Sequence, residues 1–466
     1  MMKYLIIGVL VFAVIAGFLF WKFGPSFSKK PEEKIPVVIN VWGLWEDESL
    51  MKPALDEYKK IKPEVSVNYK FQSSQNYRTR TQTKINAMEG PDIYMINNAW
   101  TLMFLKSGSI TPAPKEVFTP QEFSQTFYQV VRDDFTNYLE IKTAVDSASN
   151  IADKNKALQD EFNARGKIYA IPRGIDGLAL FVNTDILSAA GIAVPKTWNE
   201  FRDAAFKLTV SDQSNIIKTA GASIGLTGNV DHWSDILGLL FLQQPGAKID
   251  TPGDGSGADV LRFYIDFAKV SDKRVWDNTF EPSTQAFAAG KVAFYFAPSW
   301  RAHELRQINP QLNFRIAPVP QLAGKNVAWA NYWGYTVSSK SKFPKESWEF
   351  LKFLTSAEAE KILYQKASET RLFGLPYSRV DLQKELLNDP LAGAFVAQGP
   401  YYKSWYLNSD THDQGLNDEM VKYYEDAVNA AANNQDPVSS LQTTSKGIEQ
   451  VLDKYIRPNP IASPSK

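Results

Sequence analysis

The sequence predicts an α/β protein with a parallel β-sheet, and three observations support that prediction. Short apolar runs typical of buried strands alternate with amphipathic stretches typical of helices. Threonine residues begin several of these helices in capping sequences. The chain has 466 residues, of which 44% are hydrophobic and 22% charged, so it is long enough to fold into two lobes with large cores.

The first elements follow a regular order. They are a buried strand at residues 35–40, a helix from residue 48 to Pro63, an alternating strand at 65–71, a helix at 80–88 and a third strand at 92–96. Strand, helix, strand, helix, strand is the order of a lobe built on a parallel sheet.

Later elements are marked by caps and patterns. Capping boxes at Thr119, Thr197 and Thr355 each have glutamate three residues further on. Residues 144–165 are polar and helical in pattern, which predicts an insertion, and residues 178–182 form a predicted strand. Two further aromatic residues are predicted to pack in the core: Trp198 and Trp348. The acids at 250, 254 and 259 lack the spacing of a calcium loop, so they indicate a surface turn.

The composition excludes several classes of function. There is no cysteine, so disulfides, thiolate metal sites and cysteine nucleophiles are absent, and only three histidines are present. We therefore expect neither a cofactor nor a metal. Lys plus Arg and Asp plus Glu both number 51, so no net charge favours a nucleic-acid partner.

An apolar run at residues 4–21 follows Lys3, and it has nearly the length that spans a bilayer. It predicts an uncleaved N-terminal membrane anchor within residues 1–23. A cleaved signal peptide is the alternative, because residues 14–16 resemble a cleavage site. In both cases the body of the protein is exported, and residues 24–35 form a short tether.

Aromatic and polar side chains follow the first and third predicted strands. They are Trp42, Trp45 and Glu46 after the first strand, and Asn97, Asn98 and Trp100 after the third. Ligands of open parallel sheets bind beyond the carboxyl ends of the strands. Indole rings cover the apolar face of a sugar, while carboxylates and amides bind its hydroxyls. The alternative is that one ring packs into the lobe and the acids begin the next helix.

Seven segments carry a family resemblance: residues 89–93, 166–172, 178–185, 195–198, 287–293, 297–300 and 331–335. Their order and spacing resemble the extracellular solute-binding proteins of ABC transporters, in the branch of the maltose-binding proteins. The resemblance spans about residues 36–455.

The resemblance implies a two-lobe fold of the class II periplasmic-binding-protein type, with helices around a central sheet in each lobe. The ligand would lie in the cleft between lobes that close by hinge motion. The implied organisation is lobe one at 36–177 plus 335–372, lobe two at 178–330 plus 373–457, crossings near 174–182 and 328–336, and a disordered tail at 458–466.

The resemblance also implies site residues. Asp176 lies where maltose-binding proteins have an acid that contacts sugar hydroxyls, and Trp300 lies where they have a stacking tryptophan. Trp405 approximates a second such ring, and Trp333 lies at the return crossing. The complete set of predicted ligand-binding residues is Trp42, Trp45, Glu46, Asn97, Asn98, Trp100, Asp176, Trp300, Trp333 and Trp405.

The implied function is capture of a sugar or oligosaccharide as the binding component of an ABC importer. The expected partners are a small-molecule ligand, a membrane permease and, through the N-terminal segment, the membrane; we expect a monomer. The protein would work on the extracytoplasmic face of the cytoplasmic membrane, in a periplasm or at the cell surface.

Other readings stay open. The same fold could bind glycerol phosphate or peptide, and Arg173 and Arg301 beside the predicted site would suit a phosphate. The protein could also be a ligand sensor not coupled to transport. The sequence has no nucleophile elbow, His-Glu-x-x-His helix or phosphate-binding glycine loop, so we do not expect an enzyme.

Overall fold

A computed structural model describes residues 36–149, 151–269 and 273–457, together with residues 8, 11, 13–15, 17, 18 and 22. The chain divides into two compact units, Met1–Val37 and Val38–Lys466. Most of the predicted anchor, and all of the tether and the tail at 458–466, lie outside the described residues. Within the described part of the chain, no helix combines the length and the apolar character needed to cross a membrane.

The first sheet of the larger unit has six strands in the order β2-β1-β3-β12-β4, with β5 also paired to β12. They are β1 (Val37–Gly43), β2 (Val65–Phe71), β3 (Ile93–Asn97), β4 (Ile110–Thr111), β5 (Ala170–Pro172) and β12 (Trp333–Ser338). β1 and β3 run parallel, with Val41 opposite Ile93. β12 is antiparallel to β3, β4 and β5. All three predicted strands form, the first with different bounds, but the sheet is mixed and not parallel, because β12 runs antiparallel to its neighbours.

The second sheet has five strands in the order β10-β6-β9-β8-β7. They are β6 (Ala179–Asn183), β7 (Val210–Ser211), β8 (Ile217–Ala222), β9 (Val292–Ala297) and β10 (Phe314–Ala317). β8 and β9 are parallel, and the other pairs are antiparallel. A small parallel pair, β11 (Ala328–Trp329) with β13 (Tyr402–Lys403), stands apart from both sheets.

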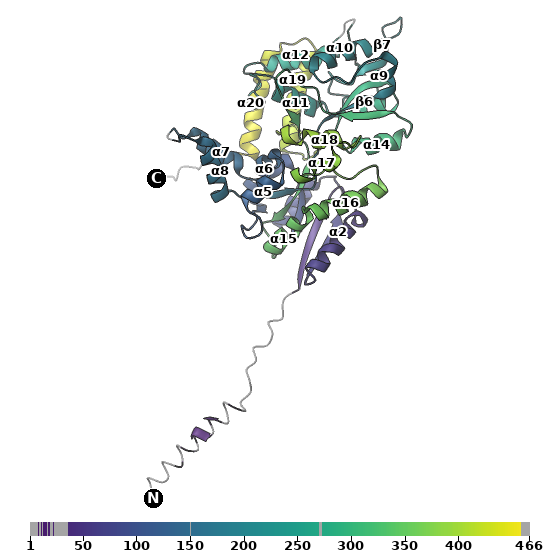
Figure 1. Cartoon of the computed structure of the whole chain (residues 1–466). Helices are drawn as coiled ribbons and strands as arrows, with labels where there is room; N and C mark the ends of the chain where they lie inside the picture. Colours follow the sequence, from purple (N-terminus) through teal and green to yellow (C-terminus); the bar gives the residue numbers. More distant parts are fainter. Residues whose placement is uncertain are drawn as a thin grey trace. The chain divides into compact units, whose positions relative to one another are not determined.

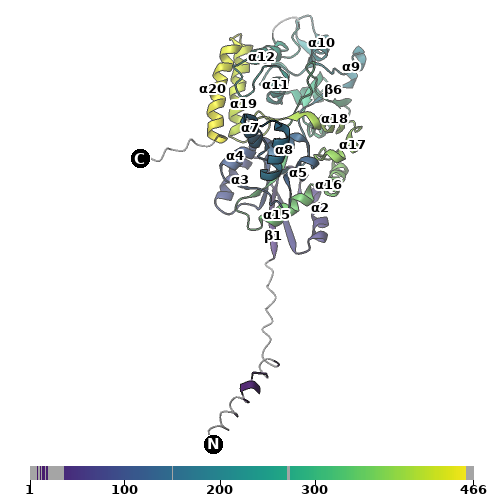
Figure 2. The same cartoon turned by 60° about the vertical axis from the view of Figure 1, so that its left-hand side comes forward.

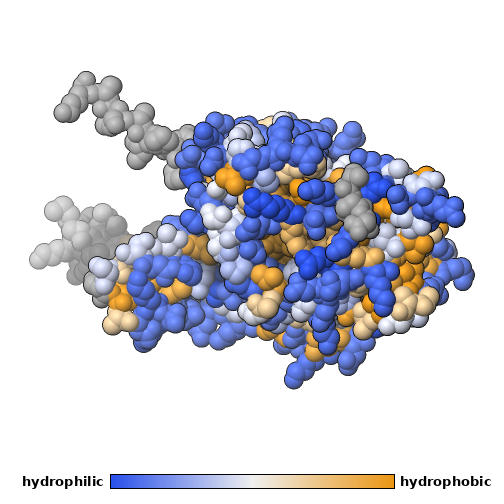
Figure 3. All heavy atoms as spheres, turned by 90° about the horizontal axis from the view of Figure 1, so that it is seen from above, coloured by the Kyte–Doolittle hydropathy of each residue, from blue (hydrophilic) through white to orange (hydrophobic). Residues whose placement is uncertain are grey.

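Helices flank the two sheets (Figure 1). In chain order they are α2 (Glu48–Ile61), α3 (Tyr77–Asn86), η1 (Asn98–Trp100), α4 (Thr101–Lys106), α5 (Pro120–Thr126), α6 (Gln129–Phe135), α7 (Tyr138–Ser147), α8 (Lys154–Arg165), α9 (Thr184–Ala190), α10 (Trp198–Leu208), α11 (Trp233–Gln243), α12 (Gly257–Asp266), α13 (Ser283–Ala288), α14 (Arg301–Ile308), α15 (Pro344–Leu354), α16 (Ala357–Thr370), η2 (Val380–Leu382), α17 (Gln383–Leu386), α18 (Gly393–Gln398), η3 (Gly399–Tyr401), α19 (Leu416–Ala432) and α20 (Pro437–Tyr455). The yellow pair α19 and α20 lies against α11 and α12 in both views (Figures 1 and 2). The face seen from above is mainly hydrophilic, with apolar patches between the polar residues (Figure 3).

The chain passes between the two sheets at two adjacent points. Gly177 and Ala330 form an antiparallel bridge there, and the Leu178 amide donates to the Trp329 carbonyl at 3.0 Å. A side chain at Gly177 would meet the Trp329 oxygen at 2.0 Å, so only glycine fits this close approach. The two crossing segments therefore run side by side.

Two expectations for individual elements need correction. The first strand extends to Gly43, so Trp42 lies within β1 opposite Tyr94 and not on the turn after it. The extension is stabilised because buried Val41 and Gly43 face the core. The third cap is Ser356 and not Thr355, since the Ser356 side chain accepts from the amide three residues on.

Other predictions are confirmed. Thr197 forms the complete capping box, and the Thr119 side chain accepts from the Glu122 amide. Trp198 and Trp348 are both buried. The predicted insertion becomes α7 and α8, whose own small apolar cluster consists of Ile141, Val145, Leu158 and Phe162.

Candidate ligand-binding site

An aromatic row begins at the carboxyl end of β1. The ring of Trp45 in the following turn contacts Trp333 edge-on, with centroids 5.3 Å apart. Trp333 in turn contacts Trp100 at 5.0 Å, and Trp100 stacks on Phe104 at 6.1 Å. Trp45 is 44% exposed and Trp100 only 1%. The outer ring is thus available to a ligand, while Trp100 supports the row from inside.

A buried charged group lies beside this row. The side chain of Glu46 is fully buried, and its carboxylate lies 3.5 Å from the Arg173 guanidinium. Neither carboxylate oxygen of Glu46 accepts a hydrogen bond from the described residues, and Arg173 Nε likewise has no acceptor. Burying charged atoms without hydrogen bonds costs free energy, so this arrangement is poised for a polar ligand.

Arg371, which follows α16, completes the charged group. Its Nε and Nη2 atoms are buried without a hydrogen-bond partner among the described residues. Burial lowers the pKa of Arg371, Glu46 acts in the opposite direction, and Arg173 lowers it further. Burial and, secondarily, Arg371 also lower the pKa of His303 in α14 to about 4. Arg371 is therefore within electrostatic reach of both Glu46 after β1 and His303 in α14.

Trp300 presents a second exposed ring at the start of α14, just past β9. Its side chain is 40% exposed. The preceding Ser299 is held by Asp176, whose carboxylate accepts from the Ser299 amide at 2.9 Å and from its hydroxyl at 2.7 Å. Asp176 also accepts from the Gly177 amide at 2.8 Å. Burial outweighs these hydrogen bonds and raises the pKa of Asp176 to about 6. In this structure Asp176 positions the Trp300 segment.

Arg301 is fully engaged by protein groups. Its Nε donates to His232 at 3.0 Å, and its terminal nitrogens donate to Glu304 at 2.6 Å and to Asp410 at 3.4 Å. The guanidinium also lies 4.1 Å from the centroid of the Trp300 ring. Arg301 therefore supports the exposed indole and has little capacity left for an anionic ligand.

Buried amides link the two halves of the fold. Asn97 donates to Asn331 at 3.1 Å, and Asn408 donates to Asn97 at 3.0 Å and to Asn98 at 2.9 Å. Asn98 itself donates to Asp134 at 2.9 Å. The side-chain amides of Asn97 and Asn98 thus form hydrogen bonds with other protein side chains, and these bonds connect segments that are distant in the sequence.

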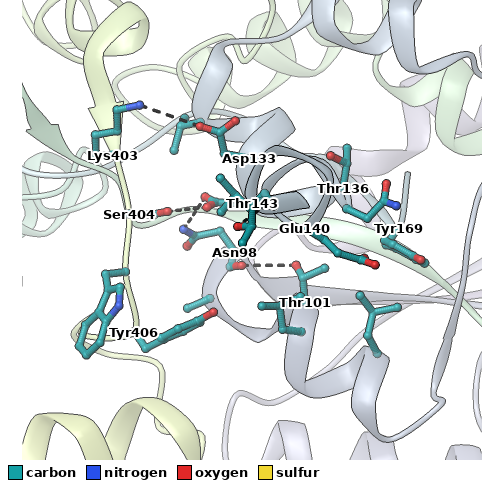
Figure 4. Close-up of a pocket in the computed structure, with 18 residues that line it drawn as sticks. Asn98, Thr101, Asp133, Thr136, Glu140, Thr143, Tyr169, Lys403, Ser404 and Tyr406 are labelled. Carbon is teal, nitrogen blue, oxygen red and sulfur yellow. Dashed lines mark hydrogen bonds and ion pairs between the residues drawn. The ribbon is translucent and has the colours of Figure 1, made fainter. Parts of the chain in front are cut away.

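Trp405 lies apart from the other predicted rings. It contacts Tyr406 and Tyr424, and with Asn98 it lines a separate cavity (Figure 4). Trp42 is half-buried in β1. The predicted residues are therefore not all in one place: Trp45 and Glu46 follow β1, Trp300 lies at the start of α14, and Asn98 and Trp405 line this cavity.

Some residues at the site have no local sequence signal. Arg371 and His303 lie outside any motif, and only the fold brings them near Glu46. Arg173 was considered for a phosphate ligand, but its ion pair with Glu46 was not expected. Among the described residues, no group of three or more His, Asp or Glu side chains is placed to hold a metal ion.

Comparison with known proteins decides the family. Residues 44–361 match the family of bacterial extracellular solute-binding proteins, which is more than half of the chain. The chain belongs to this family. The solute-binding protein is similar to the sugar-binding protein MalE of Xanthomonas citri, with 18% identity, a TM-score of 0.68, and coverage of 90% of this chain and 98% of that one. This likeness shows the two-lobe α/β fold.

Curated relatives match over shorter stretches. A probable ABC transporter-binding protein of Deinococcus radiodurans is 26% identical over 47% of this chain and 54% of its own length. The maltodextrin-binding protein of Bacillus subtilis is 25% identical over 50% of this chain and 57% of its own length. The solute-binding protein thus spans little more than half the length of these two relatives.

Proposed function

We propose that this solute-binding protein captures a sugar or oligosaccharide between its two lobes, closes around it by hinge motion and delivers it to an ABC permease. The proposed lobes are residues 36–177 plus 335–372 and residues 178–330 plus 373–457. The paired crossings at Gly177 and Ala330 would serve as part of the hinge. An exported position on the outer side of the cytoplasmic membrane is part of the same proposal.

One observation carries the proposal: buried, unpartnered charged atoms lie next to an exposed indole. Glu46 offers acceptors, while Arg173 and Arg371 offer donors. A sugar hydroxyl both donates and accepts, so hydroxyls would satisfy both kinds of atom. The apolar face of the sugar would stack on Trp45, with Trp300 supplying a ring from the other lobe. The sugar-related relatives support this ligand class.

A second candidate ligand is an anion such as a glycerol phosphate. The free nitrogens of Arg173 and Arg371 favour it, and Arg301 no longer does, because protein groups occupy that guanidinium. The buried carboxylate of Glu46 opposes an anion by repulsion. We therefore favour the neutral sugar.

Thermal shift and tryptophan fluorescence of the purified protein against mono-, di- and oligosaccharides and glycerol phosphates test the proposal. A neutral saccharide should raise the melting temperature and change the emission. Stabilisation by phosphorylated ligands alone would replace the sugar with an anion. No response to any compound would contradict the assignment. Capture of a permease by the ligand-loaded protein would test the transport step.

A further inference from the structure

A second cavity, with a volume of about 500 Å³, lies between α4, α6 and α7 on one side and residues 403–406 on the other (Figure 4). Its size is within the range of small-molecule sites. Trp45, Trp300 and Trp333 are not among the residues that line it. It is thus separate from the proposed saccharide site.

Apolar and aromatic groups make much of the wall. Leu102, Leu105 and Val130 line it together with the rings of Tyr169, Trp405 and Tyr406. Tyr169 is only 8% exposed, and its hydroxyl makes no hydrogen bond with another described residue. The hydroxyl itself keeps contact with solvent, so in the wall of the cavity it is a donor and acceptor that a ligand can reach.

The charged groups of the wall are mainly acidic. Asp133 is paired with Arg132 at 2.9 Å and lies 3.9 Å from Lys403. Asp134 instead accepts only from neutral donors, the Ser404 and Tyr332 hydroxyls and the Asn98 amide. Within the described residues, the carboxylate of Glu140 forms no ion pair. Two carboxylates of the wall therefore lack a cationic partner.

We propose that this cavity binds an organic ammonium ion with an apolar or aromatic body. The carboxylates of Asp134 and Glu140 attract the charge, and the phenol oxygen of Tyr169 accepts an ammonium hydrogen. The faces of Trp405 and Tyr406 add cation–π attraction and cover the apolar body. Lys403 points to Asp133, the residue before Asp134, and lies away from Glu140 and Tyr169 (Figure 4).

The cavity is joined to the return crossing by buried polar groups. Asp134 accepts from Asn98, Asn98 accepts from Asn408, and Asn408 also donates to Asn97. Asn97 then donates to Asn331, which belongs to the return crossing. An ammonium ion bound at Asp134 would thus lie at one end of a chain of hydrogen bonds that reaches the return crossing.

Three probes with the same body test the proposal: 2-phenylethylammonium, 2-phenylethanol and phenylacetate. They are titrated into the full-length protein by calorimetry at pH 8 without saccharide. We expect the ammonium ion to bind at least about tenfold tighter than the alcohol, since two carboxylates face it, and the anion not to bind. Equal binding of all three, preference for phenylacetate, or no binding at millimolar ammonium would overturn the proposal.

Variants locate the binding. Glu140→Gln removes an exposed carboxylate of the wall and should weaken ammonium binding about two- to fivefold. Trp405→Leu should weaken it by a similar factor of about two to five through loss of the cation–π contact. Glu161→Gln, which removes a carboxylate on α8 outside the cavity, is the matched control and should change nothing. Equal effects of Glu140→Gln and Glu161→Gln would contradict the site. Because no saccharide is present, these results are independent of sugar binding.

Discussion

The rings of Trp45 and Trp333 meet edge-on, with their centroids 5.3 Å apart and an angle of 75° between their planes. Trp45 belongs to the turn after β1, whereas Trp333 begins β12 at the return crossing. The exposed ring of the site therefore rests directly on the segment that connects the two halves of the fold. If a ligand stacks on Trp45 as proposed, that contact would bear directly on the crossing segment.

Replacing Trp45 by alanine should weaken saccharide binding about fivefold to tenfold, because a stacked aromatic contact contributes on the order of 1 kcal/mol. The ring is 44% exposed, so the melting temperature of the free protein should change little. Calorimetry with the saccharide found in the ligand screen measures the effect. Val438→Ala, an exposed apolar residue on α20, is the control. Unchanged affinity would remove Trp45 from the site.

Replacing Trp100 by alanine should lower the stability of the protein instead of acting directly on saccharide binding. Its ring is 1% exposed and packs on Phe104 and Trp333. The substitution therefore leaves a cavity, and the free energy of unfolding should fall by about 3–5 kcal/mol. Denaturant titration measures this loss. Trp100→Phe fills part of the space and should recover part of the stability. A stable Trp100→Ala protein with lost saccharide binding would show that the ring contacts ligand after all.

Removing Arg173, the positively charged partner of Glu46, should lower the free energy of unfolding. Arg173→Met leaves a fully buried carboxylate without its ion pair, which should destabilise the protein by about 3–5 kcal/mol. The double variant Glu46→Gln with Arg173→Met should recover much of that loss in urea titration. If the single and double variants are equally unstable, the pair does not interact as the 3.5 Å separation indicates.

We expect Asp176 to influence saccharide binding indirectly, by positioning the segment that carries Trp300. Asp176→Asn cannot accept from both groups of Ser299, so stability should fall by about 1–2 kcal/mol and saccharide affinity should also fall. Ser299→Ala removes the hydroxyl of the same contact. A double-mutant cycle of the two changes, read by calorimetry, should show coupling; additive effects would mean that Asp176 does not position the Trp300 segment.

Stability should fall as the pH rises toward neutrality. Burial, against hydrogen bonds from Ser404, Asn98 and Tyr332, raises the pKa of Asp134 from 3.8 to about 7. Burial likewise raises the pKa of Glu360 to about 7. The folded protein holds these protons at pH values where the unfolded chain has already lost them, so the stabilisation by protonation is complete below the unfolded pKa and is lost as the pH rises through the folded pKa.

The window for this decline runs from about pH 4, where these carboxyl groups titrate in the unfolded chain, to about pH 7, and stability should level off above it. Burial lowers the pKa of His303 to about 4, so His303 acts in the opposite direction over part of this window, and the variants separate the two effects. Melting temperatures measured across this window should decline for the wild type. Asp134→Asn should flatten the decline, and Glu360→Gln should flatten it independently. Parallel curves for wild type and both variants would refute the assignment.

The sequence predicts the local features well. Alternating apolar patterns identify β1 to β3, and the cap at Thr197 and the buried rings of Trp198 and Trp348 are as expected. The direction of β12 is not predicted, because its partners lie more than 150 residues away in the chain and no local pattern specifies which edge it joins.

The site is predicted less completely for the same reason. Trp45 and Trp100 both follow a strand, yet one is exposed and the other buried, because only Trp100 has Phe104 beneath it. Arg371 directly follows α16 and is within electrostatic reach of Glu46, although the two residues lie far apart in the sequence. Such proximity depends on tertiary packing and leaves no trace in the spacing of residues.

The row of indoles also gives the protein an intrinsic spectroscopic signal. Trp45, Trp333 and Trp100 are chromophores held at 5.3 and 5.0 Å in nearly perpendicular orientations. Neighbouring transition dipoles at such separations couple, so the row should give a distinct circular dichroism band in the aromatic region. A molecule that stacks on Trp45 changes the polarisability at one end of the coupled set. Occupancy of the site can then be followed without a dye, a label or a separation step.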